Sequence, residues 1–143
     1  MRLPPLVFLL GFAGLVPCFA DPIWLGLAHD AAPAWLDHAW ILYIALVASF
    51  MAGTFWGFSA PAALGRDGMI GLVIASALML ATWIAVVLPF KAAVATLAGV
   101  YLLQIGAELW RERALDTIPG YFKLRAQLTV GVVVALAWRL ALP

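Results

Sequence analysis

The apolar positions of this chain gather in five long stretches separated by short polar connectors. The stretches cover approximately residues 6–27, 40–64, 69–88, 92–110 and 126–142. Each is close to the roughly 20 residues that an α-helix needs to cross the hydrocarbon core of a bilayer. Because lipid offers the backbone no hydrogen-bond partners, each crossing is predicted to be helical. We therefore predict an all-α fold: an integral membrane bundle of five transmembrane helices with short loops, forming a single membrane domain over residues 1–143.

The connectors contain the turn-forming and charged residues that are typical of loops. Glycine and proline interrupt helical patterns and mark turns between elements. The predicted connectors are His29 to Pro33, Gly65 to Gly68, Pro89 to Lys91 and, as the longest, Arg111 to Arg125. Because the spans use most of the chain, little is left for a soluble catalytic domain.

Composition supports a membrane protein. Hydrophobic residues make up 66% of the 143 residues and charged residues 10%, whereas a soluble domain is about half apolar and about a quarter charged. A net charge of +1 gives no basic footprint for nucleic-acid binding. The single cysteine, Cys18, excludes an internal disulfide and a multi-cysteine metal site.

The positive charges predict an orientation. Lysine and arginine in short loops favour the cytoplasmic side. With the N-terminus inside, that side holds six of the eight basic residues: Arg2, Arg66, Arg111, Arg113, Lys123 and Arg125. The other side holds Lys91 and Arg139, together with the acidic Asp30 and Asp37 of the first external loop. We predict a cytoplasmic N-terminus and a C-terminus on the opposite side.

The aromatic residues fit the same threading. Amphipathic rings anchor at the two membrane interfaces. Those predicted near the outer interface are Trp24, Trp35, Trp40, Tyr43, Trp83 and Trp138, and those near the inner one are Trp56, Trp110 and Tyr121. Tyr101 is the aromatic residue left near mid-span.

The N-terminal stretch has two readings. Arg2, an apolar run and the small residues before Asp21 resemble a secretory signal with its cleavage site. The apolar stretch, however, continues past that point through Leu25, which favours a retained helix. Cleavage would leave four helices and an N-terminus outside.

The second span carries a pattern of small residues. Gly53 and Gly57 form a GxxxG spacing on one helix face, and Ser49 precedes them on that face. Small residues let two backbones approach closely in lipid. Ala95 and Gly99 offer a weaker face of the same kind in the fourth span. We expect packing against a neighbouring helix of the same chain, with a homodimer or a docking face for a larger complex as the alternative.

The first external loop contains two pairs of histidine and aspartate, His29-Asp30 and Asp37-His38. Imidazole and carboxylate groups are common zinc ligands. One short loop supplies all four, however, and a further ligand would have to come from elsewhere. We interpret them as solvated loop residues, and we predict neither a metal site nor a cofactor.

Charged and polar residues within the spans are few. Ionisable residues inside a membrane are functional hypotheses by default, yet the middles of the second to fifth spans contain none. Asp21 and Arg139 lie at similar predicted depth and could form an ion pair. Gln104 and Thr129 are the residues expected to bond across helices. The sequence shows no chain of such groups that would form an ion pathway.

The longest inner loop brackets its apolar and aromatic residues with basic ones. Arg111 and Arg113 stand at its start and Lys123 and Arg125 at its end. Basic juxtamembrane segments attract anionic lipid head groups. We therefore interpret this loop as an interfacial segment that anchors the topology, with a partner-binding loop as the alternative.

Several stretches resemble one family in order and spacing. They are Gly11 to Pro17, Ser49 to Gly57, Leu102 to Gln104, Ile118 to Tyr121 and Leu124 to Thr129. Together they resemble the transmembrane protein 69-like family, grouped as domain of unknown function 3429, whose members are small polytopic membrane proteins. The family pattern has a second glycine where this chain has Ala52, and a basic or imidazole residue where it has Phe55. The resemblance implies a bacterial inner-membrane or mitochondrial protein and supplies no activity.

Three function classes follow. A non-catalytic accessory, assembly or structural subunit acting through helix contacts fits best, because the loops are short and no catalytic motif is present. Its partners would be the lipid bilayer and a larger membrane complex or a second copy of the chain. A small oligomeric transporter or channel is the alternative, opposed by the lack of buried charge and of an internal repeat. An intramembrane enzyme comes third, with His29, Asp30, Asp37 and His38 as its candidate residues.

Overall fold

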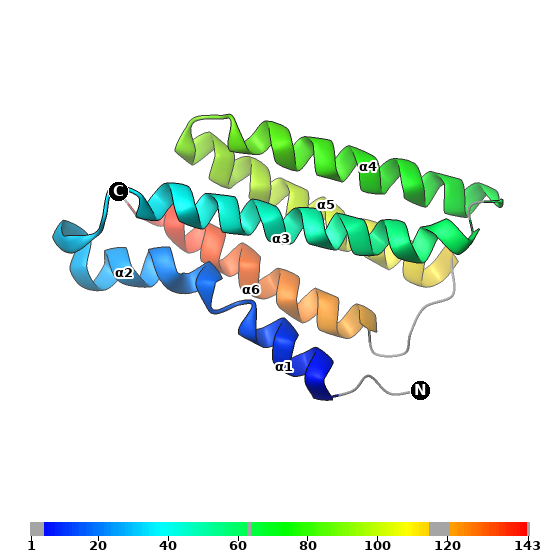
Figure 1. Cartoon of the computed structure of the whole chain (residues 1–143), viewed down its shortest axis with the longest axis horizontal. Helices are drawn as coiled ribbons and strands as arrows, with labels where there is room; N and C mark the ends of the chain where they lie inside the picture. Colours follow the sequence, from blue (N-terminus) through cyan, green and yellow to red (C-terminus); the bar gives the residue numbers. More distant parts are fainter. Residues whose placement is uncertain (1–4, 63, 115–120, 143) are drawn as a thin grey trace.

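The computed structural model describes residues 5–62, 64–114 and 121–142, and the described chain is helical throughout, with no strand in these ranges (Figure 1). Five of its helical segments are long and apolar enough to cross a membrane. They are Pro5–Ala28, Leu36–Gly57, Arg66–Val86, Phe90–Arg111 and Phe122–Ala141. The prediction of an all-α membrane fold with five transmembrane helices is therefore confirmed.

The first span is divided and the others are continuous. Its parts are α1 (Pro5–Ala13), the 3-10 turn η1 (Pro17–Phe19) and α2 (Ala20–Ala28). The remaining elements are η2 (His29–Ala31), α3 (Leu36–Ser59), η3 (Ala60–Ala62), α4 (Arg66–Val86), α5 (Phe90–Ala114) and α6 (Tyr121–Ala141). In Figure 1, α1 begins and α6 ends at opposite ends of the molecule.

We name the two ends of the molecule after a helix connection that each contains. The α2–α3 end also contains the turn between α4 and α5 and the last turn of α6, and the α3–α4 end contains the start of α1 and of α6 (Figure 1). Helix α3 packs against α4 and α5, and α5 packs against α6. The divided first span lies along α3 and α6.

Helices α5 and α6 are longer at the α3–α4 end than the sequence indicated. Arg111 and Arg125 were expected to bound a connector, but α5 continues to Ala114 and α6 begins at Tyr121. The physical reason is that these two arginines find a carboxylate partner inside the fold. The expectation that they belong to an interfacial loop touching lipid head groups is therefore wrong for Arg111 and Arg125.

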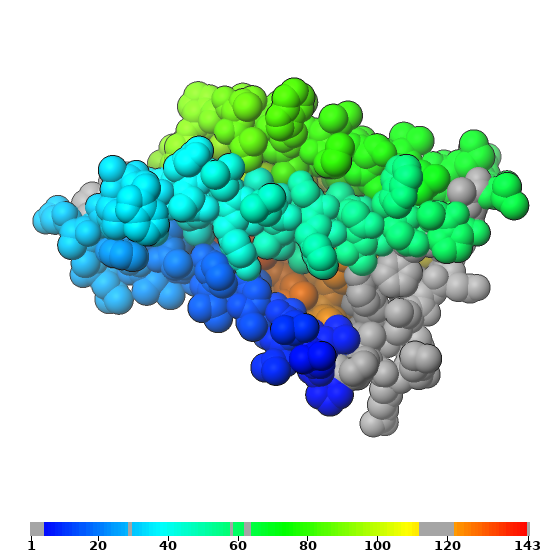
Figure 2. Space-filling view, in the orientation of Figure 1, coloured from blue at the N-terminus to red at the C-terminus, as the bar shows by residue number. Residues whose placement is uncertain are grey.

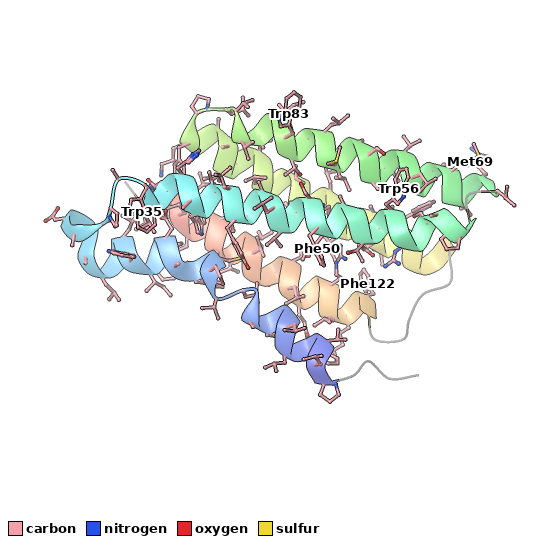
Figure 3. The ribbon with its side chains drawn as sticks, viewed as in Figure 1. Trp35, Phe50, Trp56, Met69, Trp83 and Phe122 are labelled. Atoms are coloured by element: carbon pink, nitrogen blue, oxygen red, sulfur yellow. The ribbon has the colours of Figure 1, made fainter. Side chains whose placement is uncertain are left out.

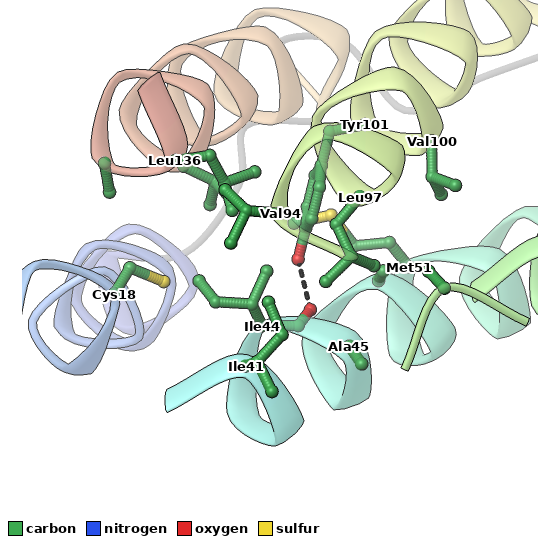
Figure 4. Packing of buried hydrophobic residues seen from close by; sticks show 14 of the residues in the cluster. Cys18, Ile41, Ile44, Ala45, Met51, Val94, Leu97, Val100, Tyr101 and Leu136 are labelled. Carbon is green, nitrogen blue, oxygen red and sulfur yellow. Dashed lines mark hydrogen bonds between the residues drawn. The ribbon is translucent and has the colours of Figure 1, made fainter. Parts of the chain in front are cut away.

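The apolar core lies between α3, α5 and α6 (Figure 4). Ile44, Val94, Leu97, Tyr101 and Leu136 are all completely buried. The Tyr101 hydroxyl donates a hydrogen bond to the Ile44 carbonyl oxygen at 2.6 Å, which satisfies this mid-span polar group without water (Figure 4).

The surface is hollowed between α1 and α3, and α6 is visible in the opening (Figure 2). A crevice of about 180 Å³ there is lined mainly by apolar side chains, among them Leu10, Leu15, Phe50 and Leu128. Helix α1 has no buried residue of its own, so it attaches to the rest of the fold over a small area.

Candidate functional site

The small-residue face of α3 points away from the rest of the chain. Gly53 and Gly57 are exposed, and a Cβ atom added at either position would meet nothing within 4 Å among the described residues. Gly99 on α5 is equally open, and Ala95 is exposed. The expected packing of these glycines against a neighbouring helix of the same chain is thus not found in the described ranges.

A groove between α3 and α4 adjoins the exposed glycines. Its floor and walls enclose about 250 Å³ and are formed by Ser49, Ala52, Gly53, Trp56, Ala75, Ser76 and Met79. A second hollow of about 390 Å³ shares Ser49 and Met79 and continues to Trp83 and Val86. The Ser76 hydroxyl is satisfied by the Leu72 carbonyl one turn away, so the groove presents little unmet polarity.

Trp56 and Trp83 each line one of the two hollows. Trp56 contributes to the first and Trp83 to the second, and Figure 3 shows both side chains on the α3–α4 side of the molecule. Both rings are exposed to what would be lipid or a partner.

The closest approach of α3 and α4 involves a glycine that the sequence pattern did not single out. A Cβ atom on Gly71 would lie 2.8 Å from Ser59 Cβ and closer still to its hydroxyl oxygen. Ser59 is completely buried, and its hydroxyl has no hydrogen-bond partner in the described structure. Gly71 therefore permits this helix crossing, whereas Gly53 and Gly57 do not contribute to it.

At the α2–α3 end, two carboxyl groups share one guanidinium. Arg139 Nε on α6 lies 3.0 Å from Asp21 Oδ1 on α2. The same Nε donates to Asp37 Oδ1 on α3 at 3.3 Å, and Arg139 Nη2 donates to Asp37 Oδ2 at 3.0 Å. The structure thus brings together Asp21 and Arg139, as the sequence suggested, and adds Asp37, which the sequence assigned to a loop.

Two residues of α5 complete this cluster. The Arg139 guanidinium carbon lies 4.7 Å from the centre of the Phe90 ring, a cation–π distance. Lys91 Nζ donates to the carbonyl oxygens of Leu142 at 2.6 Å and Arg139 at 3.3 Å, which caps the end of α6. The cluster therefore joins α2, α3, α5 and α6.

Beside this cluster, two side chains of α3 donate hydrogen bonds to backbone carbonyls at the break in the first span. Proline has no N–H, so Pro22 cannot donate to the Cys18 carbonyl; Trp40 Nε1 donates to that oxygen instead, at 2.7 Å. The Tyr43 hydroxyl donates to the Gly14 carbonyl at 2.7 Å. The two aromatic side chains were expected only as interfacial anchors, and the structure gives them carbonyl partners as well.

A second buried charge cluster lies at the α3–α4 end. Glu108 forms ion pairs with Arg111, one turn along α5, and with Arg125 of α6, whose Nη2 lies 2.9 Å from Glu108 Oε1. All three are buried. The Arg111 guanidinium carbon lies 5.7 Å from the centre of the Phe55 ring, at the position where the family resemblance led us to expect a basic or imidazole residue.

Buried polar residues of α5 form one continuous face. Tyr101, Gln104, Glu108 and Arg111 follow each other at spacings of three and four residues, which places them on one side of a helix. Gln104 Nε2 donates to the Ala48 carbonyl of α3 at 2.9 Å. Thr129, the other residue expected to bond across helices, is buried on α6. Glu108 and Arg111 are buried charges, so the expectation that this chain lacks buried charge is wrong.

The residues considered as metal ligands do not converge. Asp37 is engaged with Arg139, while Asp30 and His38 are exposed; the His29 side chain lies outside the described residues. No group of three His, Cys, Asp or Glu residues able to hold a metal ion occurs in the described part of the chain.

The comparisons with known proteins agree with the fold. The chain is 31% identical over 130 residues to Transmembrane protein 69 of Xenopus tropicalis, and the alignment covers 89% of this chain and 50% of that protein. The chain thus spans about half the length of this curated relative. No solved structure matches. Because the family model described as "Protein of unknown function (DUF3429)" matches residues 3–141, the chain belongs to that family of multi-pass membrane proteins.

Proposed function

We propose that this protein is a non-catalytic accessory or assembly subunit of a membrane complex, and that a transmembrane helix of a partner packs on the α3 face around Gly53 and Gly57. The observation that carries the proposal is that both glycines are open, with no described residue within 4 Å of a Cβ position. In lipid, small residues favour close helix contact. Glycine also lowers the stability of a helix by about 1 kcal/mol relative to alanine at an interior position.

The adjoining groove supports a helix as the occupant. Ala52, Gly53 and Ala75 provide a shallow floor beside the exposed Trp56 ring. A partner helix with small residues of its own would bring its backbone close to α3 and cover this ring. Apolar contact and backbone proximity, not charge, would hold it there.

The same proposal includes the location. Of the bacterial inner membrane and the mitochondrial membrane that the resemblance implies, we place the chain in the bacterial inner membrane, and the distribution of Lys and Arg supports a cytoplasmic N-terminus and a periplasmic C-terminus. The α3–α4 end, which contains Arg66, Lys123 and the paired Arg111 and Arg125, would then face the cytoplasm.

Site-specific photo-crosslinking in native membranes tests the docking face. A photoreactive residue at position 57 should yield one discrete protein adduct, whereas the same residue at position 106 should not. Gly106 is the matched control because it is also exposed and no atom of the described structure lies within 4 Å of its Cβ position. An adduct of twice the chain's mass would assign the face to a homo-oligomer, and labelling of lipid alone at position 57 would refute docking.

A small oligomeric transporter or channel is the second candidate. The observation in its favour is the buried polar face of α5 from Tyr101 to Arg111, together with the charge cluster at each end. Between Tyr101 and Arg139, however, the interior contains Val94, Leu97 and Leu136, all completely buried. Solute uptake by liposomes containing the purified protein, lost on substitution of Gln104, would favour this candidate over the accessory role. For an intramembrane enzyme, the candidate side chains that the structure describes do not converge.

A further inference from the structure

We propose that Asp21 is a proton-binding site: its carboxyl group is held as a neutral acid beside the Asp37 carboxylate, inside the α2–α3 end of the fold. This inference concerns a different part of the molecule from the α3 docking face and does not depend on it.

Arg139 forms a two-point contact with Asp37. Its Nε donates to Asp37 Oδ1 at 3.3 Å, and its Nη2 donates to Asp37 Oδ2 at 3.0 Å. This is the two-point geometry that a guanidinium prefers with a carboxylate. Asp37 thus has the two-point contact with Arg139, whereas Asp21 has a single ion pair with its Nε.

Asp21 lies next to this contact, on the Nε side of Arg139. Its side chain is completely buried. Oδ1 forms an ion pair with Arg139 Nε at 3.0 Å, but Nε donates its hydrogen bond to Asp37, and neither Asp21 oxygen accepts a hydrogen bond within the described structure. An ionised carboxylate that is buried without hydrogen bonds is strongly unfavourable, and such a group takes up a proton instead.

Asp37 interacts directly with Asp21, and two carboxylates at close range disfavour double ionisation. The charged groups that interact with this pair are Arg139 on α6 and Lys91 on α5, and the neighbouring His38 on α3 is exposed. Lys91 Nζ is directed at the last carbonyl oxygens of α6, so it does not serve Asp21. A proton on Asp21 restores the balance, because the acid can donate to Asp37.

The proton has a structural consequence. As a neutral acid, Asp21 lets α2 pack against α3 and α6. Loss of the proton as pH rises would place a second negative charge beside Asp37 and weaken the attachment of α2. The stability contributed by the neutral form is thus present at low pH and lost as pH rises.

Infrared spectroscopy of the purified full-length protein in lipid nanodiscs tests the proposal. The wild type should show a buried carboxylic-acid C=O band at neutral pH that disappears in Asp21→Asn and persists in Asp67→Asn, whose side chain is exposed. Absence of the band in the wild type, or its persistence in Asp21→Asn, would overturn the proposal.

Thermal unfolding provides an independent readout. Asparagine resembles a neutral carboxyl group, so Asp21→Asn should keep the melting temperature of the wild type and remove its decline with rising pH. Asp37→Asn should lower the melting temperature, because Arg139 loses its two-point partner. If Asp21→Asn fails to fold or loses as much as Asp37→Asn, Asp21 is needed as a charge and the proposal is wrong.

Discussion

The indole nitrogen of Trp40 donates to the Cys18 carbonyl at 2.7 Å, at the position where the helix itself has no donor because residue 22 is proline. Pro22, which lacks the backbone donor, lies in α2, whereas Trp40, which supplies a donor in its place, lies in α3. This contact ties the divided first span to α3 in the part of the molecule where Asp21, Asp37 and Arg139 meet.

Removing the indole donor should weaken this connection. Trp40→Phe keeps most of the ring but leaves the Cys18 carbonyl buried without its partner, so we expect a loss of about 1 to 3 kcal/mol in the free energy of unfolding. Denaturant titration in mild detergent measures it. The matched control is Trp83→Phe, because Trp83 is exposed; equal losses in the two variants would contradict the role given to Trp40.

Restoring the backbone donor should compensate for the missing indole. Pro22→Ala returns an N–H to the position four residues after Cys18, where an α-helix would use it. In the Trp40→Phe background this change should therefore recover part of the lost stability. A double-mutant cycle isolates the coupling between the two positions. Strict additivity would show that the two donors do not serve the same carbonyl.

The crossing of α3 and α4 should tolerate no side chain at Gly71. Gly71→Ala places a methyl group against Ser59, and overpacking of this kind costs about 1 to 3 kcal/mol. Gly106→Ala, at an open position, should cost nothing measurable. Ser59→Gly should rescue Gly71→Ala by removing the obstructing atoms. The free energy of unfolding should be measured for the wild type, Gly71→Ala, Gly106→Ala and the double variant Ser59→Gly with Gly71→Ala. Equal stability of Gly71→Ala and Gly106→Ala would rule out the close crossing.

The cluster at the α3–α4 end should depend on Glu108, the carboxylate that pairs with both arginines in the described part of the chain. Glu108→Gln leaves Arg111 and Arg125 without the charge that pairs with both, and breaking a buried ion pair costs about 3 to 5 kcal/mol. Removing Arg125 as well, in Glu108→Gln with Arg125→Gln, should cost less than the sum of the two single changes. Circular dichroism on heating in detergent provides the comparison, with the exposed Asp67→Asn as the control. Additive losses would contradict the pairing.

The spans were predictable because hydropathy and length alone decide whether a helix can cross a bilayer. The ends of α5 and α6 were not, because Arg111 and Arg125 are typical of loops when they are read alone. Their burial depends on Glu108, and only the Glu108–Arg111 spacing of three residues on one helix was visible in the sequence. The contact between Glu108 and Arg125 comes from tertiary packing.

The polar contacts of the first span show the same limit. Asp21 and Arg139 could be placed at similar depth from the sequence, but Asp37 could not be added, since α3 begins at Leu36 and not at Trp40 as predicted. The GxxxG spacing identified small residues correctly without revealing which way they face. Gly71, which does bring two helices together, has Ala75 and not a second glycine four residues on, and this spacing was not singled out in the sequence.

The central claim is that the open α3 face binds a partner helix, and the size of the particle extracted from native membranes with its surrounding lipid tests it most directly. Wild type and Gly106→Leu should be found in a particle larger than one chain, and Gly53→Leu should reduce it to the size of a single chain. The same size for all three proteins would contradict the claim.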